Sequence, residues 1–324
     1  MPHHAVKPSA PKPAKPKPAP APQQGTPAVA KPAGPVKPSQ RDLPDPGLTR
    51  DEKTKQLDAY TYKKNDRGAK LYGPNGVQSA DVRQGYIGDC YLASALAAVA
   101  GTRPDAIKQA IKDNGDGTFT VRFYEVGWDG KKTAHQESVD ADLASDGDRP
   151  AYANSTEQVE GKDFMELWPS ILEKAYAAWK GSYDAIGNGG NSGDVMTALT
   201  GEPCRSAPTQ GAGNNDPLWT KMKKASDEKR PMTASTGGEE DPRYKDPEAG
   251  VYGWHAYTVL GVEEKKAGAV TDRIVTLRNP WAKRRRNADA AAVGDAGNET
   301  GGGVFQLKWP EFRRLYDNVV VQGA

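Results

Sequence analysis

Cys90 stands where a thiol could act as a nucleophile. The segment DVRQGYIGDC, which has the character of a loop, ends at this cysteine, and the following YLASALAAVA is rich in residues that favour a helix. A thiol at the start of a helix is shifted toward the thiolate by the helix dipole and by free backbone N–H groups. The alternative is that Cys90 is a small buried residue on an apolar helix face, which is the commoner role of cysteine.

Four residues of the loop before Cys90 bear on that chemistry. Gly85 and Gly88 would let backbone approach a substrate closely, since neither has a side chain. The amide of Gln84 could join the Cys90 N–H in an oxyanion hole, where one donor contributes roughly 3–4 kcal/mol of transition-state stabilisation. Asp89 is a candidate N-cap whose charge opposes ionisation of the thiol, so a cationic partner is required.

His255 is the best candidate for that partner among the four histidines. His3 and His4 lie in a proline-rich N-terminal segment, and His135 is predicted to lie in a polar surface loop. His255 begins the predicted strand HAYTVLGV. A single histidine on a strand more often has a structural role, so its neighbours must decide between the two.

The neighbour that favours catalysis is Asn279. The strand that follows His255 ends at this asparagine, and the two strands are predicted to pair as a hairpin around Ala267-Gly268. In that register His255 lies directly opposite Asn279 on one face, where the carboxamide could bond and orient the imidazole. Trp281 could shield that bond from water. A shift of one residue would move the two side chains to opposite faces.

The elements that would carry these residues indicate an α+β fold. The first half is predicted to be mainly helical, with helices at residues 91–100, 104–112, 163–181 and 194–199. The second half is richer in strands, including WHAYTVLGVEE, DRIVTLRNPW and the strand–helix–strand segment GVFQLKWPEFRRLYDNVVV. We therefore expect a helical subdomain over residues 48–207, a β-rich subdomain over residues 208–324, and a cleft between them.

Five segments resemble motifs of the calpain family of cysteine proteases, in the same order. They are QGYIGDCYLASALAAVA, LWPSILEKAYAAWKGSYDAI, WHAYTVLGV, LRNPW and GGVFQLKWPEFRRLY. Together they span about residues 70–321, and five motifs in order are far more specific than one. The resemblance implies a papain-like core of two subdomains. It also implies these site residues: Cys90 as nucleophile, His255 as general base and acid, Asn279 as orienting residue, Gln84 as oxyanion donor, and Gly88 and Trp281 at the substrate.

The resemblance also suggests calcium as a cofactor. Gly76 and Asp81 stand at matching offsets before the nucleophile, and Asp184 takes the place of a family glutamate. A hard cation could bind these residues through oxygen ligands, although Asp81 and Asp184 could equally be loop and capping residues. The family's ligands in the second subdomain have no visible counterpart in AKRRRNADAAAVGDAG, and Tyr91 replaces the usual tryptophan after the nucleophile. The chain does not continue into C2-like or EF-hand domains, so we expect a minimal, bacterial-type form.

Composition adds a tail and excludes several classes. Residues 1–47 contain 14 of the 26 prolines. They are predicted to form a disordered or semi-rigid arm that serves as a spacer, a pro-segment, a docking arm or a surface tether. Residues 1–41 hold six lysines and one arginine with no acid, which leaves 37 of the 44 basic residues against all 42 acidic ones. That acidic remainder argues against nucleic acid as a partner.

No apolar run approaches the roughly 18 residues of a membrane span, the N-terminus lacks a signal core, and two cysteines cannot build a disulfide framework. We expect a monomer, cytoplasmic by default, that acts on protein or peptide substrates. The leading hypothesis is a cysteine endopeptidase that works through a Cys-His-Asn triad and an acyl-enzyme. The alternatives are a transglutaminase- or deamidase-type acyl transfer with the same triad, and a catalytically silent calpain-like binding module.

Overall fold

The computed structural model describes residues 41–50, 58–64, 69–159, 162–210, 216–245, 251–267, 270–282 and 302–323. Most of the predicted arm and the basic run at residues 283–286 lie outside these residues. The chain divides into two units, Met1–Lys31, which also lies outside them, and Pro32–Ala324, which contains everything described below. The predicted boundary between residues 207 and 208 stays a prediction.

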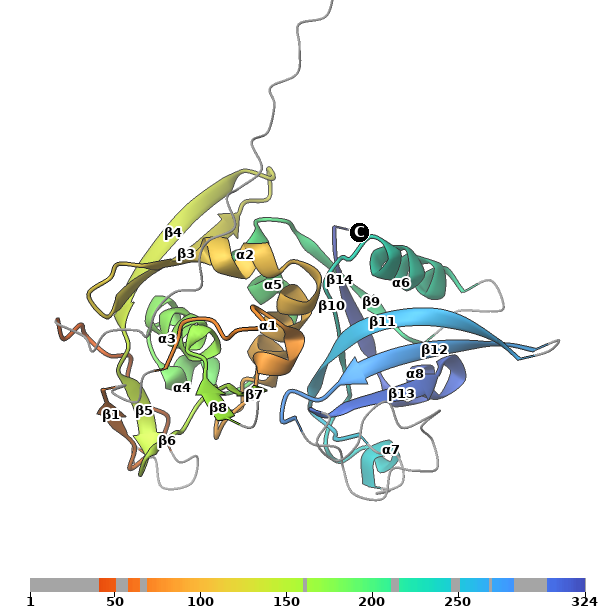
Figure 1. The fold of residues 1–324 in the computed structure, drawn as a ribbon. Coiled ribbons are helices and arrows are strands. Elements are labelled where there is room, and N and C mark those ends of the chain that lie inside the picture. The colour runs from red at the N-terminus through yellow and green to blue at the C-terminus, as the bar shows by residue number, and fades with distance from the viewer. Residues whose placement is uncertain are drawn as a thin grey trace, which may run out of the picture. The chain divides into compact units, whose positions relative to one another are not determined.

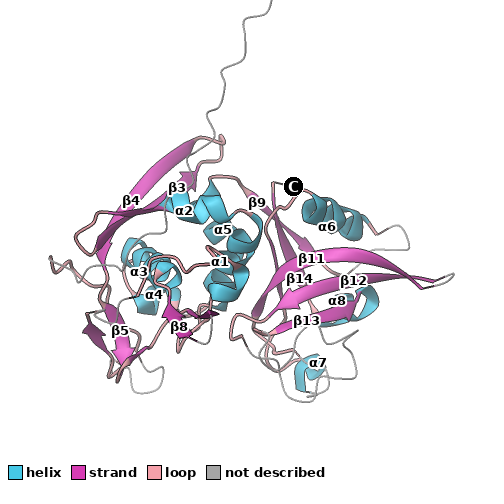
Figure 2. Ribbon diagram, in the orientation of Figure 1, coloured by secondary structure: helices cyan, strands magenta, loops and turns pink. Residues whose placement is uncertain are grey.

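The described chain mixes helices and strands, as an α+β fold requires (Figures 1 and 2). The helices are α1 (Cys90–Thr102), α2 (Pro104–Ala110), α3 (Trp168–Lys180), α4 (Tyr183–Ile186), α5 (Ser192–Thr200), α6 (Pro217–Asp227), α7 (Pro242–Lys245), α8 (Trp309–Leu315) and the 3-10 helix η1 (Ser79–Asp81). The strands are β1 (Thr61–Lys63), β2 (Ile111–Asp113), β3 (Thr118–Val126), β4 (Lys132–Asp140), β5 (Leu143–Asp146), β6 (Arg149–Pro150), β7 (Thr156–Val159), β8 (Lys162–Met165), β9 (Cys204–Pro208), β10 (Met232–Ser235), β11 (Ala256–Ala267), β12 (Val270–Arg278), β13 (Val304–Lys308) and β14 (Asn318–Gln322).

The largest sheet is antiparallel, with strand order β13-β12-β11-β10-β14-β9. Three smaller sheets, β1-β5-β6, β2-β3-β4 and β7-β8, all belong to the first half of the chain. The prediction that this half is mainly helical is therefore wrong. The sequence predicted β3 from its alternating apolar residues, but its partner β4 is largely polar and exposed and gives no such pattern.

Helix α1 is buried on nearly every side. All residues from Tyr91 to Ala100 are buried, and half of them are alanines whose small side chains let neighbouring elements approach closely. The helix packs against α5 and against strands β10 and β11 of the large sheet (Figure 1). Ser94 fixes it there, since its hydroxyl donates to the Ala256 carbonyl at 2.9 Å and its own carbonyl accepts from Thr258 Oγ1 at 2.8 Å.

Two hydrophobic cores flank this contact. The first gathers side chains of α1, α2, α3, α5 and β3, together with Ala256 and Val320 from the large sheet. The second gathers side chains of α6 and α8 with those of the large sheet. Helix α1 belongs to the first core and lies against the sheet that carries the second, so the start of α1 and the start of β11 are held side by side.

Candidate active site

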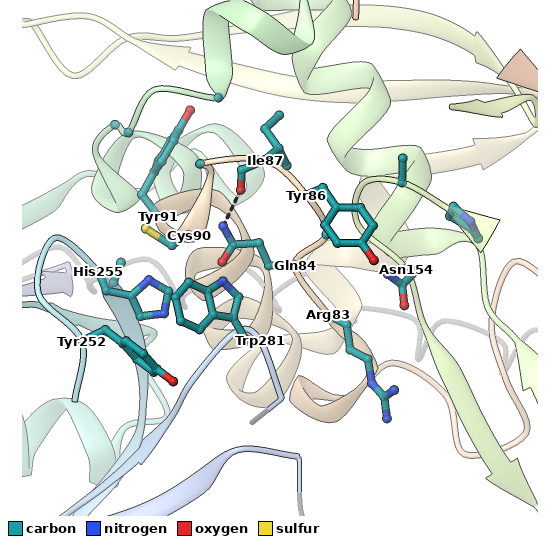
Figure 3. Close-up of a pocket in the computed structure, with 18 of the residues that line it drawn as sticks. Arg83, Gln84, Tyr86, Ile87, Cys90, Tyr91, Asn154, Tyr252, His255 and Trp281 are labelled. Atoms are coloured by element: carbon teal, nitrogen blue, oxygen red, sulfur yellow. Dashed lines mark hydrogen bonds between the residues drawn. The ribbon is translucent and has the colours of Figure 1, made fainter. Parts of the chain in front are cut away.

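A cleft of about 1600 Å³ opens where α1 meets the large sheet (Figure 3). Its lining includes all of the predicted substrate and catalytic residues except Asn279, namely Gln84, Gly88, Cys90, His255 and Trp281. Pockets for small ligands usually measure about 300–1,000 Å³. This cleft is larger and open, which suits an extended length of polypeptide better than a small molecule.

Cys90 is the first residue of α1, as the sequence predicts, and its sulfur points into the cleft (Figure 3). The glycines before it are packed closely against other parts of the backbone. A Cβ on Gly85 would lie 2.3 Å from the Ala151 carbonyl oxygen, and one on Gly88 would lie 2.2 Å from the Gly187 oxygen. Both glycines are therefore required by close contacts within the protein. Both also line the cleft, so their predicted approach to a substrate stays a prediction.

Burial, together with a smaller effect of the charge of Asp89, raises the pKa of the Cys90 thiol to about 11. The backbone N–H groups of Ala256, Tyr91 and Cys90 act in the opposite direction. The helix terminus thus stabilises the thiolate as the sequence predicts, but burial outweighs it. Before substrate binds, the thiol keeps its proton.

His255 lies just before β11 and is hydrogen-bonded to Asn279, which lies just after β12. The distance from His255 Nε2 to Asn279 Oδ1 is 2.9 Å. The predicted register is nevertheless wrong. Thr258 pairs with Arg278, so Tyr257 rather than His255 falls opposite Asn279. At the other end of the two strands Ala267 pairs with Val270, and the register shifts between Val259 and Gly261.

The contact survives this error because the shift at the site is two residues, which returns a side chain to the same face of the sheet. The bulge between Val259 and Gly261 adds one residue to β11. At this end of the hairpin the difference between the predicted and observed registers is therefore an even number of residues. A one-residue insertion of this kind leaves no clear mark in the sequence, so the register could not have been predicted from the hairpin turn alone.

The tautomer of His255 follows from its partner. Asn279 Oδ1 also accepts the backbone N–H of Trp281 at 3.0 Å. Because a backbone N–H can only donate, the shared atom must be the amide oxygen, and His255 Nε2 must carry the proton that it donates. Nδ1 of the neutral imidazole is then the nitrogen that can accept a proton.

Aromatic rings surround the imidazole. The Trp281 ring centroid lies 4.2 Å from that of His255, and the Tyr257 ring meets it edge-on at 4.9 Å. Trp281 therefore covers the hydrogen bond to Asn279, as expected. This burial lowers the pKa of His255 to about 4, against the smaller opposite effect of Asn279. The imidazole is neutral at pH 7 in the empty cleft.

Gln84 is hydrogen-bonded to the segment that follows β12, where Asn279 lies. Its backbone N–H donates to the Pro280 carbonyl at 3.0 Å, and its side-chain Nε2 donates to Ile87 O at 2.6 Å (Figure 3). The buried guanidinium of Arg278 adds a bond to Val82 O at 2.6 Å. The segment before the nucleophile and the segment that holds Asn279 are thus joined directly.

Two of the residues predicted to hold calcium, Asp81 and Asp184, accept N–H groups of the protein. Asp81 Oδ2 accepts the N–H groups of Gln78 at 2.7 Å and of the Trp168 indole at 3.2 Å, so it caps η1. Asp184 Oδ1 instead accepts the Arg50 amide at 3.2 Å. These contacts do not form an oxygen cage around Gly76, Asp81 and Asp184, and calcium binding stays a prediction.

The sequence analysis missed the acid that contacts the loop around Gly76. Buried Glu166 accepts the Gly73 amide through Oε1 and the Ser155 hydroxyl, at 2.9 Å, through Oε2. Its position two residues before Trp168, at the start of α3, was the available signal. The analysis was also wrong about His135, which lies in β4 with its ring stacked 5.0 Å from that of Trp179.

The sequence of this chain is similar to those of known proteins. The family described as "Calpain family cysteine protease" matches residues 50–292. The chain is 33% identical over 269 residues to Calpain-type cysteine protease DEK1 of Zea mays, a match that covers 76% of this chain and 11% of the maize protein. It is 29% identical over 220 residues to Calpain-A of Drosophila melanogaster, covering 64% and 24% of the two chains. It is 25% identical over 262 residues to human Calpain-9, covering 76% and 36%.

The cleft is lined by a thiol, Cys90, and by an imidazole, His255. The sequence matches make the class specific: this chain belongs to the calpain family of cysteine proteases. The chain spans between 11% and 36% of the length of the three relatives named. Among the helices that the structure describes, none has the length and apolar character to cross a bilayer.

Proposed function

We propose that the cleft is the active site of a calpain-type cysteine endopeptidase in which Cys90, His255 and Asn279 form the catalytic triad. The hydrogen bond of 2.9 Å between His255 and Asn279, beside a cleft that Cys90 also lines, carries this proposal. The two hydrophobic cores on either side support a papain-like arrangement of two subdomains.

The resting site holds a neutral thiol and a neutral imidazole. Binding of a peptide brings its carbonyl carbon to Cys90 Sγ. As the C–S bond forms, the thiol proton passes to His255 Nδ1, and the imidazolium is stabilised by its Nε2–H bond to Asn279. The charge that appears on the imidazole offsets the charge that appears at the sulfur, so neither is created alone in the buried site.

The carbonyl oxygen becomes an oxyanion near the Cys90 backbone N–H and the Gln84 amide, whose Nε2 keeps one hydrogen after bonding Ile87. His255 then gives its proton to the leaving amine as the C–N bond breaks, which leaves a thioester on Cys90. Water, deprotonated by the same imidazole, attacks the thioester and releases the acid and the thiol.

The test compares two cysteine variants. Cys90→Ala is expected to reduce cleavage of casein by several orders of magnitude, because it removes the nucleophile. Cys204→Ala is the matched control, since Cys204 is also partly buried but lies on β9, outside the lining of the cleft. It should cleave casein at a rate close to that of the unmodified protein.

The alternatives are separated in the same assay. Incorporation of an amine donor without cleavage would assign the site to acyl transfer. A folded protein that neither cleaves casein nor incorporates the amine donor would be a silent binding module. Repeating the digest with a calcium chelator, and then with calcium restored, tests the predicted cofactor separately from the triad.

A further inference from the structure

Asp89 and Glu173 form a pair of buried carboxyl groups directly behind the nucleophile. Asp89 precedes Cys90 and is 0% exposed, while Glu173, from the middle of α3, is 1% exposed. The mechanism proposed above uses neither residue. Burial of two acids beside a reactive thiol is costly, so their state of ionisation matters.

Asp89 does not cap its helix, contrary to the prediction. It occupies the N-cap position of α1, but its side chain makes no capping bond. Both of its carboxylate oxygens are buried, and the N–H groups at the start of α1 do not bond to them. Its partner is instead the carboxyl of Glu173. Two ionised carboxylates only accept hydrogen bonds, so this contact requires a proton on one of them.

Among the described residues, no cation neutralises a negative charge on Glu173. Both of its oxygens face the amide of Ala153, at 3.0 and 2.9 Å. The charged neighbour on α3, Lys174, has its ammonium bound to Asp140 and Asp45. In the part of the chain that the structure describes, the groups acting on the two carboxyls are each other and backbone amides, with no lysine, arginine or histidine among them.

Among the described residues, the other titratable groups on which Asp89 or Glu173 acts are neutral at pH 7. They are the Cys90 thiol and the phenols of Tyr62 on β1, Tyr91 on α1, Tyr152 before β7 and Tyr183 on α4. Burial raises the pKa of each. Burial likewise raises the pKa of Asp89 to about 7, and that of Glu173 well above its usual range.

We propose that Asp89 and Glu173 share one proton, and that the single negative charge left on the pair controls how readily the Cys90 thiol ionises. The pair acts on the thiol through its charge and not by contact with substrate, since neither carboxyl lies in the cleft lining. The proposal rests on Cys90 being the nucleophile of the proposed function. A second proton, bound below about pH 7, makes the pair neutral and removes its opposition to the thiolate.

Substitution of each carboxyl by an amide of the same shape tests how many charges the pair carries. Asp89→Asn and Glu173→Gln each remove one ionisable group but leave one carboxylate, so each single variant keeps a net charge of −1. The double variant has none. One unit charge at 5–10 Å and an effective dielectric constant near 20 changes the thiol's ionisation constant by about ten- to a hundredfold or more. We measure the rate at which iodoacetamide alkylates Cys90 between pH 5 and 9, by peptide mapping.

Above pH 7 the single variants are expected to match the wild-type rate, and the double variant to react at least tenfold faster. Cys204 in the same samples is the internal control, because the charges that act on it come from Asp194 and Glu202 instead. If each single variant accelerates alkylation partway, both carboxyls are ionised and the proposal is wrong. If the double variant matches wild type, the pair has no electrostatic effect on the thiol and the proposal is equally wrong.

Infrared spectroscopy of the unmodified protein tests the shared proton without any variant. At pH 8 the carbonyl stretch of a protonated carboxyl should be present, and its absence would overturn the proposal. Alkylation and infrared spectra do not depend on peptide cleavage. An inactive protein with the expected alkylation profile would therefore refute the proposed function and leave this inference standing.

Discussion

Glu173 and Lys174 are neighbours on α3, both 1% exposed, but they lie in opposite electrostatic surroundings. The ammonium of Lys174 lies 2.7 Å from Asp140 Oδ1, 2.5 Å from Asp45 Oδ1 and 2.7 Å from the Asp142 carbonyl. Glu173 meets another acid, Asp89. The buried ammonium of Lys174 is therefore matched by opposite charges, whereas the buried carboxyl of Glu173 is not.

The difference shows what each region is for. The Lys174 cluster joins α3 to the end of β4 and to the segment at Asp45, so its charges hold elements together. The Asp89–Glu173 pair joins α3 to the residue before the nucleophile and keeps a negative charge there. A buried ion pair contributes little net stability but is costly to break, whereas an unmatched charge is retained where it affects a reactive group.

The largest effect is expected from breaking the matched cluster. Lys174→Met leaves Asp140, which is 0% exposed, and Asp45 without their cation. The free energy of unfolding should fall by about 3–5 kcal/mol in urea denaturation followed by circular dichroism. Glu173→Gln, one residue away, is the matched control and should change stability by less than about 1 kcal/mol, because the unmatched pair loses no cation. Equal losses in the two variants would erase the distinction between the clusters.

The next effect is the pH dependence of stability. Unfolding returns the raised pKa of Asp89, about 7, to its usual value near 3.8. Between these pH values the folded protein binds more protons than the unfolded one, so the free energy of unfolding falls as pH rises. Burial and the charge of Asp89 also raise the pKa of Glu173, which adds to the same trend.

His255 acts in the opposite sense, since its pKa is lowered from 6.5 to about 4 and stability rises with pH between those values. Comparing wild type with Asp89→Asn/Glu173→Gln cancels this contribution. Relative to the double variant, wild type should lose a few kcal/mol between pH 4 and 7. A difference in unfolding free energy that stays constant with pH would mean that the pair does not titrate there.

The comparison also marks the limit of the sequence analysis. The start of α1 at Cys90 and the strands around His255 and Asn279 were predicted because local patterns determine them. The hairpin register was missed because a bulge between Val259 and Gly261 leaves no pattern. Strand β4 was missed because its side chains are polar and exposed.

The Asp89–Glu173 pair lay beyond the sequence for another reason. Asp89 before a helix predicts a cap, and Glu173 within an amphipathic helix predicts exposure to solvent. Only the tertiary fold brings Glu173 of α3 to Asp89, the residue before α1, and the cap stays unused. Contacts between residues far apart in the chain have no local signal, and the charge near the nucleophile depends on such a contact.

The smallest effect concerns Tyr62, which contacts the matched cluster. Its ring lies 4.9 Å from Lys174 Nζ, and its hydroxyl donates to the Pro46 carbonyl at 2.7 Å. Tyr62→Phe keeps the ring but loses this hydrogen bond, so it should cost about 1 kcal/mol of unfolding free energy in urea. Tyr62→Leu also removes the cation–π contact and should cost a further 0.5–2 kcal/mol or so. If both cost the same, the ring adds nothing to the stabilisation of Lys174, and carboxylates and backbone alone account for that cluster.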